Sequence, residues 1–417
     1  MNKHTKFFLT FLYFIVQISL FAQEKRIVGY LPNYRFKVAD KIDFCKMTHL
    51  NICFANPDLK GNITISDTLP EILKYIRSKN PELKIYISLA GGALLKEQSE
   101  AWIWLLDNPK NRPDFIKKIV DFTEKYKFDG VDVDLEWKDV TKGYSPFILE
   151  LKKELTPKKL ELTAALPAIH RYSNITNEAI HSFDFIHIMA YDERGSWAPN
   201  KPGQHSSYAF AQKSINFWRD KIGIPAEKLT LGLPFYAYNF TDPTKTVSHT
   251  IANIMSYDYQ NLYRDSIGLI YYNGKPTLEA KIELATKDLA GVMIWELGQD
   301  TTGESAMINT VFNKFKTLKF KTTDDYCGFS KEEITLIENN KFKNSVEIKV
   351  IKKSFTISSN ELPKLRVSVK DEKGKKSDLK IKKKDEYYLY KIKKLKKGTY
   401  TLHISNGKNS FDKKLTL

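Results

Sequence analysis

Cysteine is scarce in this chain of 417 residues, which contains only Cys45, Cys53 and Cys327. Three cysteines cannot form the dense disulfide framework of a small secreted protein, and their spacing matches no metal-binding motif. Cys45 and Cys53 lie in apolar segments, so we expect them to be small core residues, although the sequence leaves a bridge between them open. The fold must therefore be held by a hydrophobic core. No metal and no other cofactor is expected.

The chain also lacks a glycine-rich phosphate loop after its first apolar run, which argues against a dinucleotide-binding fold. Acidic residues are too few to balance the basic ones, and the formal net charge is +17. Residues 321–417 carry 25 Lys and Arg against 13 Asp and Glu, whereas the other 320 residues have a net charge of only +5. A nucleic-acid enzyme would concentrate basic residues around its cleft, so no nucleic-acid partner is expected.

No apolar run is long enough to span a membrane. The run at residues 7–20, which follows Lys3 and Lys6, is the nearest to that length. With Ala22 close behind it, the segment 1–22 is typical of a signal peptide, and no cysteine stands there to carry a lipid anchor. We therefore expect a secreted or cell-surface protein that has no membrane span once the signal peptide is removed.

What the chain does contain is a repeated alternation of strand-like and helix-like segments. The eight strand-like apolar runs are 26–34, 47–57, 84–92, 128–137, 159–168, 183–192, 228–238 and 289–300. Apolar spacing near 3.6 predicts helices at 69–78, 114–126, 145–155, 205–219 and 277–287. Near-continuous apolar strands alternating with helices indicate a parallel sheet covered on both faces. Eight such units within residues 23–320 predict a (β/α)₈ TIM barrel, of class α/β.

The pattern changes after residue 320. Short alternating runs at 346–351, 364–369, 387–392 and 399–404 predict a small all-β sandwich over residues 321–417. This region contains no tryptophan, which disfavours a carbohydrate-binding module. Its final stretch resembles the C-terminal sorting domains of type IX secretion substrates, which would make secretion machinery a partner. A purely structural sandwich is the alternative.

The segment Asp129–Glu136 reads Asp-Gly-Val-Asp-Val-Asp-Leu-Glu. Side chains alternate along a strand, so Asp132, Asp134 and Glu136 share one face while the apolar residues take the other. The apolar face suits the surrounding helices, and the acids must then point into the barrel toward its C-terminal mouth. Carboxyl groups this close in a partly buried space cannot all ionise, which raises the pKa of at least one. Glu136, the outermost, is the expected general acid.

This segment is similar to the fourth-strand motif Asp-Gly-x-Asp-x-Asp-x-Glu of glycoside hydrolase family 18, the chitinase family. Ser88–Gly92 resembles the third-strand Ser-x-Gly-Gly pattern with one residue more. Met189–Asp192 resembles the sixth-strand Met-x-Tyr-Asp, and Trp295 stands where the family has its eighth-strand tryptophan. The resemblance extends over about residues 26–315.

The resemblance implies substrate-assisted retaining catalysis. This mechanism needs no second catalytic carboxylate from another strand, so the acids on strand four are sufficient. The substrate's own 2-acetamido oxygen would attack the anomeric carbon while Glu136 protonates the leaving oxygen. Asp134 would hold the acetamido N–H, and Asp132 would share a proton with Asp134. Tyr191 would donate toward the acetamido oxygen, and Asp192 would support the same sugar.

Aromatic residues near the ends of the predicted strands are expected to contact the sugar. Trp295 would form the floor of the cleft, with a core tryptophan as the alternative. Tyr30, Phe54, Trp137 and Tyr236 are further candidates, for which core packing is an equal alternative. The segment 239–288 is too short for the full module that many family members insert there, which predicts an open cleft and endo cleavage.

The expected substrate is a polysaccharide or oligosaccharide that contains N-acetylglucosamine, with β-1,4-linked chitin first. An endo-β-N-acetylglucosaminidase acting on the chitobiose core of N-glycans is the alternative enzyme, because both substrates carry the acetamido group. A non-catalytic chitinase-like lectin is the remaining alternative. Such lectins typically lose the acid that Glu136 supplies here.

Overall fold

The computed structural model describes residues 25–320, 327, 339, 342–351, 354–359, 365–383, 388–392, 398–407 and 409–416. The predicted signal peptide, residues 1–22, lies outside the described residues. The chain divides into two compact units, Met1–Cys327 and Gly328–Leu417. None of the helices in the described ranges is both long and apolar enough to cross a membrane.

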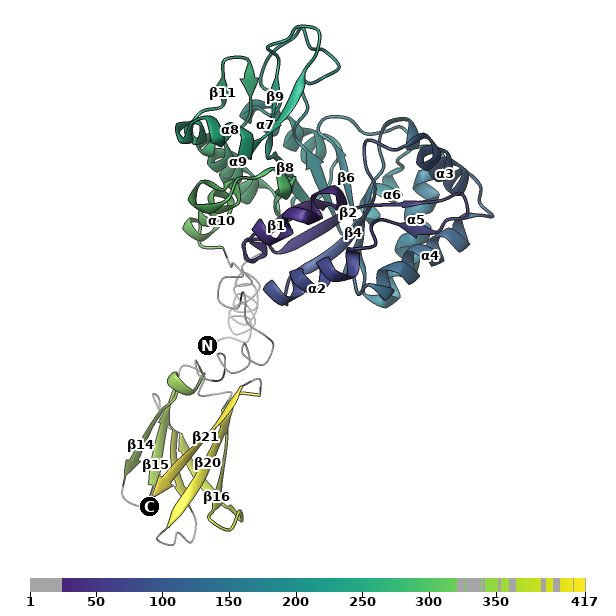
Figure 1. Ribbon diagram of the computed structural model, residues 1–417. Helices are drawn as coiled ribbons and strands as arrows, with labels where there is room; N and C mark the ends of the chain where they lie inside the picture. Colours follow the sequence, from purple (N-terminus) through teal and green to yellow (C-terminus); the bar gives the residue numbers. More distant parts are fainter. Residues whose placement is uncertain are drawn as a thin grey trace, which may run out of the picture. The chain divides into compact units, whose positions relative to one another are not determined.

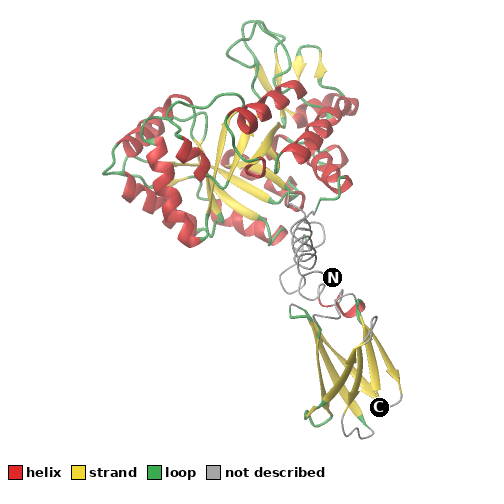
Figure 2. Ribbon diagram, turned by 180° about the vertical axis from the view of Figure 1, so that it is seen from behind, coloured by secondary structure: helices red, strands yellow, loops and turns green. Residues whose placement is uncertain are grey.

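The first unit is a closed barrel of eight parallel strands. In chain order they are β1 (Arg26–Pro32), β2 (His49–Pro57), β4 (Lys84–Ala90), β5 (Gly130–Asp134), β6 (Glu161–Pro167), β7 (Phe185–Met189), β8 (Leu229–Pro234) and β13 (Gly291–Trp295). Each strand pairs with its neighbours in the chain, and β1 closes the barrel by pairing with both β2 and β13. Figure 2 shows these strands surrounded by helices. The predicted TIM barrel is confirmed, and each predicted run contains one of its strands.

Helices cover the outside of the barrel. They are α2 (Leu69–Lys79), α3 (Lys96–Asp107), α4 (Arg112–Lys125), α5 (Tyr144–Leu155), α6 (Asn177–Ser182), α7 (Tyr208–Ile215), α9 (Lys275–Asp288) and α10 (Met307–Thr317). The five predicted helices are confirmed, and α3, α6 and α10 were not predicted. In α2, the buried residues Leu69, Leu73 and Ile76 recur at helical spacing and face the sheet. Proline stands in the first turn of α2, α4 and α9, where its missing N–H leaves no helix bond unmade.

The interior of the barrel has its own core, rich in aromatic rings. Tyr30, Tyr86, Phe185, Tyr191 and Tyr236 pack there with smaller residues. Tyr30, Tyr86 and Phe185 occupy positions that alternate along β1, β4 and β7 with the aliphatic side chains facing the helices, and Tyr191 and Tyr236 follow the ends of β7 and β8. The barrel is therefore a filled scaffold with a site at one end.

A small α+β segment follows β8. The strands β9 (Tyr236–Asn239), β10 (Val247–Thr250), β11 (Ser266–Ile267) and β12 (Ile270–Tyr271) form an antiparallel sheet in the order β10-β9-β12-β11. Helix α8 (Ile251–Tyr257) follows β10, and the Thr250 hydroxyl caps it by accepting from the Asn253 N–H at 3.0 Å. Figure 1 shows α7, α8 and α9 grouped with this sheet.

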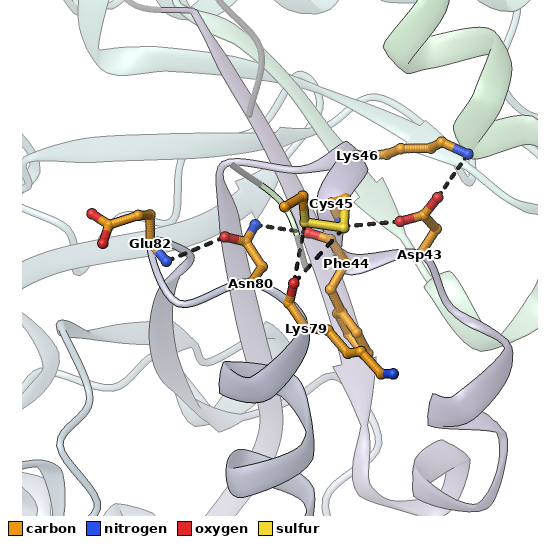
Figure 3. Close-up of a disulfide and its surroundings, with 8 residues drawn as sticks. Asp43, Phe44, Cys45, Lys46, Lys79, Asn80 and Glu82 are labelled. Carbon is orange, nitrogen blue, oxygen red and sulfur yellow. Dashed lines mark hydrogen bonds and ion pairs between the residues drawn. A yellow bond between two sulfur atoms is a disulfide. The ribbon is translucent and has the colours of Figure 1, made fainter. Parts of the chain in front are cut away.

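The prediction for Cys45 is wrong. Cys45 forms a disulfide with Cys327, 282 residues away in the chain. Cys53 is free and fully buried in the barrel interior, which confirms its expected place in the core. Figure 3 shows the bridge beside Phe44, Lys79 and Asn80. The pairing could not be read from spacing, because it depends on where the end of the first unit meets the first crossover.

The described residues of the second unit form two four-stranded antiparallel sheets. One has the order β14 (Glu347–Ile351), β15 (Ser354–Ser358), β19 (Tyr388–Ile392), β18 (Leu379–Lys383); the other has β17 (Lys376–Ser377), β16 (Arg366–Asp371), β20 (Thr399–Ser405), β21 (Ser410–Thr416). Their core includes Phe355, Ile357, Val369, Leu402 and Ile404. The four predicted runs fall on β14, β16, β19 and β20. The all-β architecture agrees with the prediction.

Candidate active site

The acidic row lies on β5 and the residues directly after it. Val131, Val133 and Leu135 are buried in the core between barrel and helices, so the acids take the inner face as expected. Asp132 is fully buried and Asp134 is 4% exposed, whereas Glu136 is only half-buried. The row therefore runs from the barrel interior toward the solvent at its C-terminal mouth.

Asp132 is held by hydroxyl groups from three other strands. Tyr30 and Ser88 donate to its Oδ2 at 2.7 and 2.6 Å, and Thr163 donates to its Oδ1 at 2.7 Å. His187 Nε2 lies 3.8 Å from the same Oδ1. Three hydroxyl donors and a nearby imidazole satisfy this carboxylate within the barrel, so Asp132 acts as the buried end of the row.

Asp134 differs from Asp132 because part of its carboxyl is unsatisfied. Its Oδ1 is buried and accepts no hydrogen bond from any residue that the structure describes. Burial, followed by the charges of Glu136 and Asp132, raises the pKa of Asp134 well above its usual range. A buried oxygen without a partner is costly, so this atom is a natural place for a donor from a bound molecule.

Glu136 has the pKa of a general acid. Burial, followed by the negative charge of Asp192, raises the pKa of Glu136 to about 7. Its position depends on Gly92, because a Cβ on that residue would lie 2.3 Å from Glu136 Oε1. The glycine pair after β4 thus leaves room for the acid that follows β5.

Tyr191 and Asp192 follow the end of β7. The Tyr236 hydroxyl donates to Asp192 Oδ1, and His205 Nδ1 lies 3.7 Å from the same oxygen. The Tyr191 hydroxyl makes one weak contact, to Met293 Sδ at 3.9 Å. Asp192 is therefore supported by its neighbours, whereas the Tyr191 hydroxyl has no strong acceptor among the described residues.

An aromatic wall completes the site. Trp295 stacks on Phe54, with ring centroids 5.7 Å apart and 25° between the planes, and meets Tyr30 edge-on at 5.7 Å. The wall lines one cavity of about 770 Å³ together with Asp134, Glu136 and Asp192. Such a cavity has the size of a site for a small molecule or a few sugar units.

A family model described as "Glycosyl hydrolases family 18" matches residues 26–300 of this chain. The chain belongs to glycoside hydrolase family 18. The matched range is the barrel from its first strand to the loop after its last. It includes every acidic and aromatic residue described above.

Among solved structures, the family 18 chitinase ChiB from the chitin utilization locus of Flavobacterium johnsoniae is 48% identical. The similarity covers 74% of this chain and 99% of that one, with a TM-score of 0.72. A chitinase from Bacteroides thetaiotaomicron is 29% identical over 70% of this chain and 96% of its own, with a TM-score of 0.60. The match in fold thus extends over nearly all of both barrels.

Among curated proteins, an endochitinase of Manduca sexta is 30% identical over 258 residues, 52% of this chain and 46% of that protein. A probable chitinase of Drosophila melanogaster is 27% identical over 54% of this chain and 58% of its own. The chain spans about half the length of these curated relatives.

Within this family 18 barrel, the structure gathers most of the candidate residues into one place. Asp134, Glu136, Tyr191, Asp192, Tyr30, Phe54, Trp137 and Trp295 all line the cavity. Asp132 and Tyr236 do not line it. Asp132 lies deeper in the barrel, and Tyr236 is 5% exposed and turned to Asp192. Tyr236, the first residue of β9, is therefore a supporting residue for Asp192.

Several cavity residues were not foreseen from the sequence. They include Tyr34, Asn56, Gln98, Met189 and Tyr238. Met189 is the first residue of the motif Met189–Asp192. Tyr238 and Tyr34 are the last residues of the predicted apolar runs 228–238 and 26–34. Gln98 lies on a helix that was not predicted, so nothing in the local pattern pointed to it.

Proposed function

We propose that the protein hydrolyses β-1,4-linked N-acetylglucosamine polymers, chitin or its oligosaccharides, by substrate-assisted retaining catalysis. The observation that carries the proposal is the pair Glu136 and Asp134 in one cavity. Glu136 has a pKa of about 7, and the buried Asp134 Oδ1 has no hydrogen-bond partner in the described part of the chain. Family 18 membership and the 48% identity to a chitinase structure support the same substrate class.

In the first step, the acetamido carbonyl oxygen of the bound sugar forms a bond to the anomeric carbon. The glycosidic C–O bond breaks, and Glu136 gives its proton to the leaving oxygen. Asp134 Oδ1 accepts the acetamido N–H, and Tyr191 donates its hydroxyl to the acetamido oxygen. Asp132, which is expected to share a proton with Asp134, takes that proton as positive charge develops on the bicyclic intermediate. The negative charge then left on Asp134 stabilises this intermediate.

In the second step, Glu136 acts as a base. It removes a proton from water as the water oxygen attacks the anomeric carbon, which reopens the ring and returns the acetamido group. The proton restores Glu136 to its acid form. The configuration at the anomeric carbon is the same in product and substrate because each step inverts it once.

Trp295 would bind the apolar face of the same sugar. Its ring is held by stacking on Phe54 and by the edge of Tyr30, so it presents a fixed surface to the cavity. Trp137 is 65% exposed at the rim and would contact a neighbouring sugar. Endo cleavage is part of the proposal, supported by the small size of the segment between β8 and α9.

Product analysis tests the substrate. N-acetylglucosamine oligosaccharides and a high-mannose glycopeptide are incubated with the enzyme and with Glu136→Gln. We expect chitooligosaccharides to be cut internally, and we expect turnover to fall about 10²- to 10⁴-fold in the variant while binding remains. Cleavage of the glycopeptide alone would favour the N-glycan alternative, and near-normal turnover by Glu136→Gln would overturn the mechanism. Oligosaccharide binding without any wild-type turnover would indicate a lectin.

Export to the medium or cell surface is also proposed. The Cys45–Cys327 disulfide supports an oxidising compartment. A sorting role for the second unit stays a prediction, and residues 393–397 of its final stretch lie outside the described residues. Sequencing both ends of the protein recovered from culture medium tests it, since a sorting signal would be expected to be removed on export.

A further inference from the structure

We propose that Lys281 is a positioning residue for Tyr191 and Asp192, through the segment His205–Ser206. Lys281 lies on α9 outside the barrel and does not line the active-site cavity. The inference deepens the proposed function, because it concerns the residues expected to hold the acetamido group. No sequence motif singled out Lys281.

Lys281 is a fully buried cation. Its Nζ donates to the Ser206 carbonyl oxygen, to Ser206 Oγ and to Asn273 Oδ1, at 2.5 to 2.7 Å. An ammonium has three donors, and these three neutral oxygens use all of them. Within the described part of the chain, no carboxylate forms an ion pair with Lys281. A buried charge held only by neutral oxygens is costly, so it points to a specific role.

The hydrogen bonds of Ser206 and its neighbour connect Lys281 to the active site. Because Ser206 Oγ accepts from Lys281, its own proton is free to be donated, and it goes to the Ala190 carbonyl oxygen at 2.6 Å. On the other side, the Glu193 N–H donates to the His205 carbonyl oxygen at 2.9 Å. The segment 205–206 therefore bonds to the residues immediately before and after Tyr191–Asp192.

The His205 ring lies beside Asp192 and beside the tyrosine that supports Asp192. It is fully buried, 3.7 Å from Asp192 Oδ1, and its centroid is 4.8 Å from that of Tyr236, which donates to Asp192. Displacing Ser206 would move this ring and loosen Asp192. Asp192 in turn helps to set the pKa of Glu136, so the effect would reach the general acid.

The hydrogen bonds require the ammonium form. A neutral amine has two donors and would leave one of the three facing oxygens unsatisfied. Burial lowers the pKa of Lys281 to about 7, against the opposing charge of Asp265. Burial lowers the pKa of the nearby His205 imidazole, the charge of Asp192 raises it, and the charge of Lys281 lowers it. The rings of Tyr236 and Tyr238 pack against the imidazole. The ammonium therefore loses its proton in the same pH range as Glu136.

The test compares Lys281→Met, Ser206→Ala and Lys287→Met with the wild type on a soluble N-acetylglucosamine oligosaccharide. Lys287 lies on the same helix and is exposed, so its variant is the matched control. We expect kcat per folded molecule to fall about 10- to 100-fold in Lys281→Met and Ser206→Ala, with less change in KM, and to stay unchanged in the control. The folded fraction of each variant, which is needed to calculate kcat per folded molecule, is determined from its thermal unfolding curve.

The pH profile separates positioning from simple packing. The wild-type kcat should fall above pH 7 more steeply than one ionisation allows, since Glu136 and Lys281 both lose protons there. The kcat of Lys281→Met should fall with the slope of a single ionisation. The kcat of Ser206→Ala should keep the steep fall of the wild type above pH 7, because Lys281 is still present. An alkaline limb equally steep in Lys281→Met and wild type, or a normal kcat in Lys281→Met, would overturn the inference.

Should Lys281→Met fail to fold, Ser206→Ala decides, and a wild-type kcat in that variant overturns the inference. The proposed function is judged separately by the wild type. An inactive wild type on every oligosaccharide contradicts the function, whereas an active wild type with unaltered variants contradicts only the role of Lys281.

Discussion

The proton on Glu136 is controlled by groups around it. Burial and the charge of Asp192 both disfavour the ionised form, which brings the pKa of Glu136 to about 7. Because this pKa is raised, the acid form is present below pH 7 and is lost as the pH rises through that value. We therefore expect kcat/KM for a soluble oligosaccharide to fall above about pH 7.

Replacing Asp192 tests the cause. In Asp192→Asn the nearby negative charge is removed, so the pKa of Glu136 should drop and the alkaline fall in kcat/KM should move to lower pH. The profile is measured at constant ionic strength on the same oligosaccharide. A fall at the same pH in the variant and the wild type would show that burial alone sets this pKa.

Gly92 tests the steric side of the site. The added methyl of Gly92→Ala would lie 2.3 Å from Glu136 Oε1, so the carboxyl must move. Gly92 has no positive φ, so the change brings no backbone strain there. We expect kcat to fall by about 10²-fold or more, with a thermal unfolding midpoint close to that of the wild type. Normal kcat in a folded variant would mean that Glu136 has another working position.

At the scale of elements, the loop after β13 organises the start of α10. Asp300 accepts from the N–H groups of Thr301, Met307 and Ile308 at 2.8 to 2.9 Å, which satisfies two donors in the first turn of the helix. This cap comes from seven residues before the helix begins. No capping residue stands directly before α10 in the sequence, which explains why that helix was not predicted.

Removing the cap should destabilise the barrel. Asp300→Ala leaves two helix donors unpaired in a buried place, and we expect the free energy of unfolding to fall by about 1 to 2 kcal/mol in urea titrations. Glu304→Ala, at an exposed position in the same loop, is the control and should change little. Equal stability of both variants would show that water replaces the carboxylate.

At the scale of the whole first unit, the disulfide joins the first crossover to the end of the barrel chain. A cross-link between residues 282 apart restricts the unfolded chain strongly, and removing such a bond typically costs about 2 to 5 kcal/mol. We expect Cys45→Ser with Cys327→Ser to lower the thermal midpoint of the barrel by several degrees, measured by calorimetry.

A reducing agent provides the control. It should lower the midpoint of the wild type to that of the double variant and leave the double variant unchanged. Cys53 is buried and free in both proteins, so any effect common to them reports on Cys53 and not on the bridge. An unchanged wild-type midpoint under reduction would contradict a stabilising role.

The sequence by itself determined the barrel and the acidic row. Strands buried on both faces must be nearly continuous in apolar residues, and alternation along one strand decides which side chains share a face. Both patterns are local, so the eight strands and the common face of Asp132, Asp134 and Glu136 follow from short segments. The expectation of a raised pKa within the row follows from the same alternation for Asp134, whereas the raised pKa of Glu136 also depends on Asp192, which follows another strand.

Only the tertiary structure decided which distant residues meet. The Cys45–Cys327 bridge, the Asp300 cap and the contacts from Lys281 to Ser206 join positions between 7 and 282 residues apart. It also placed Tyr236 behind Asp192 instead of in the cleft. These outcomes depend on the closure of the barrel, which sets the distances between residues on different strands and helices, and no periodicity within one segment contains that information.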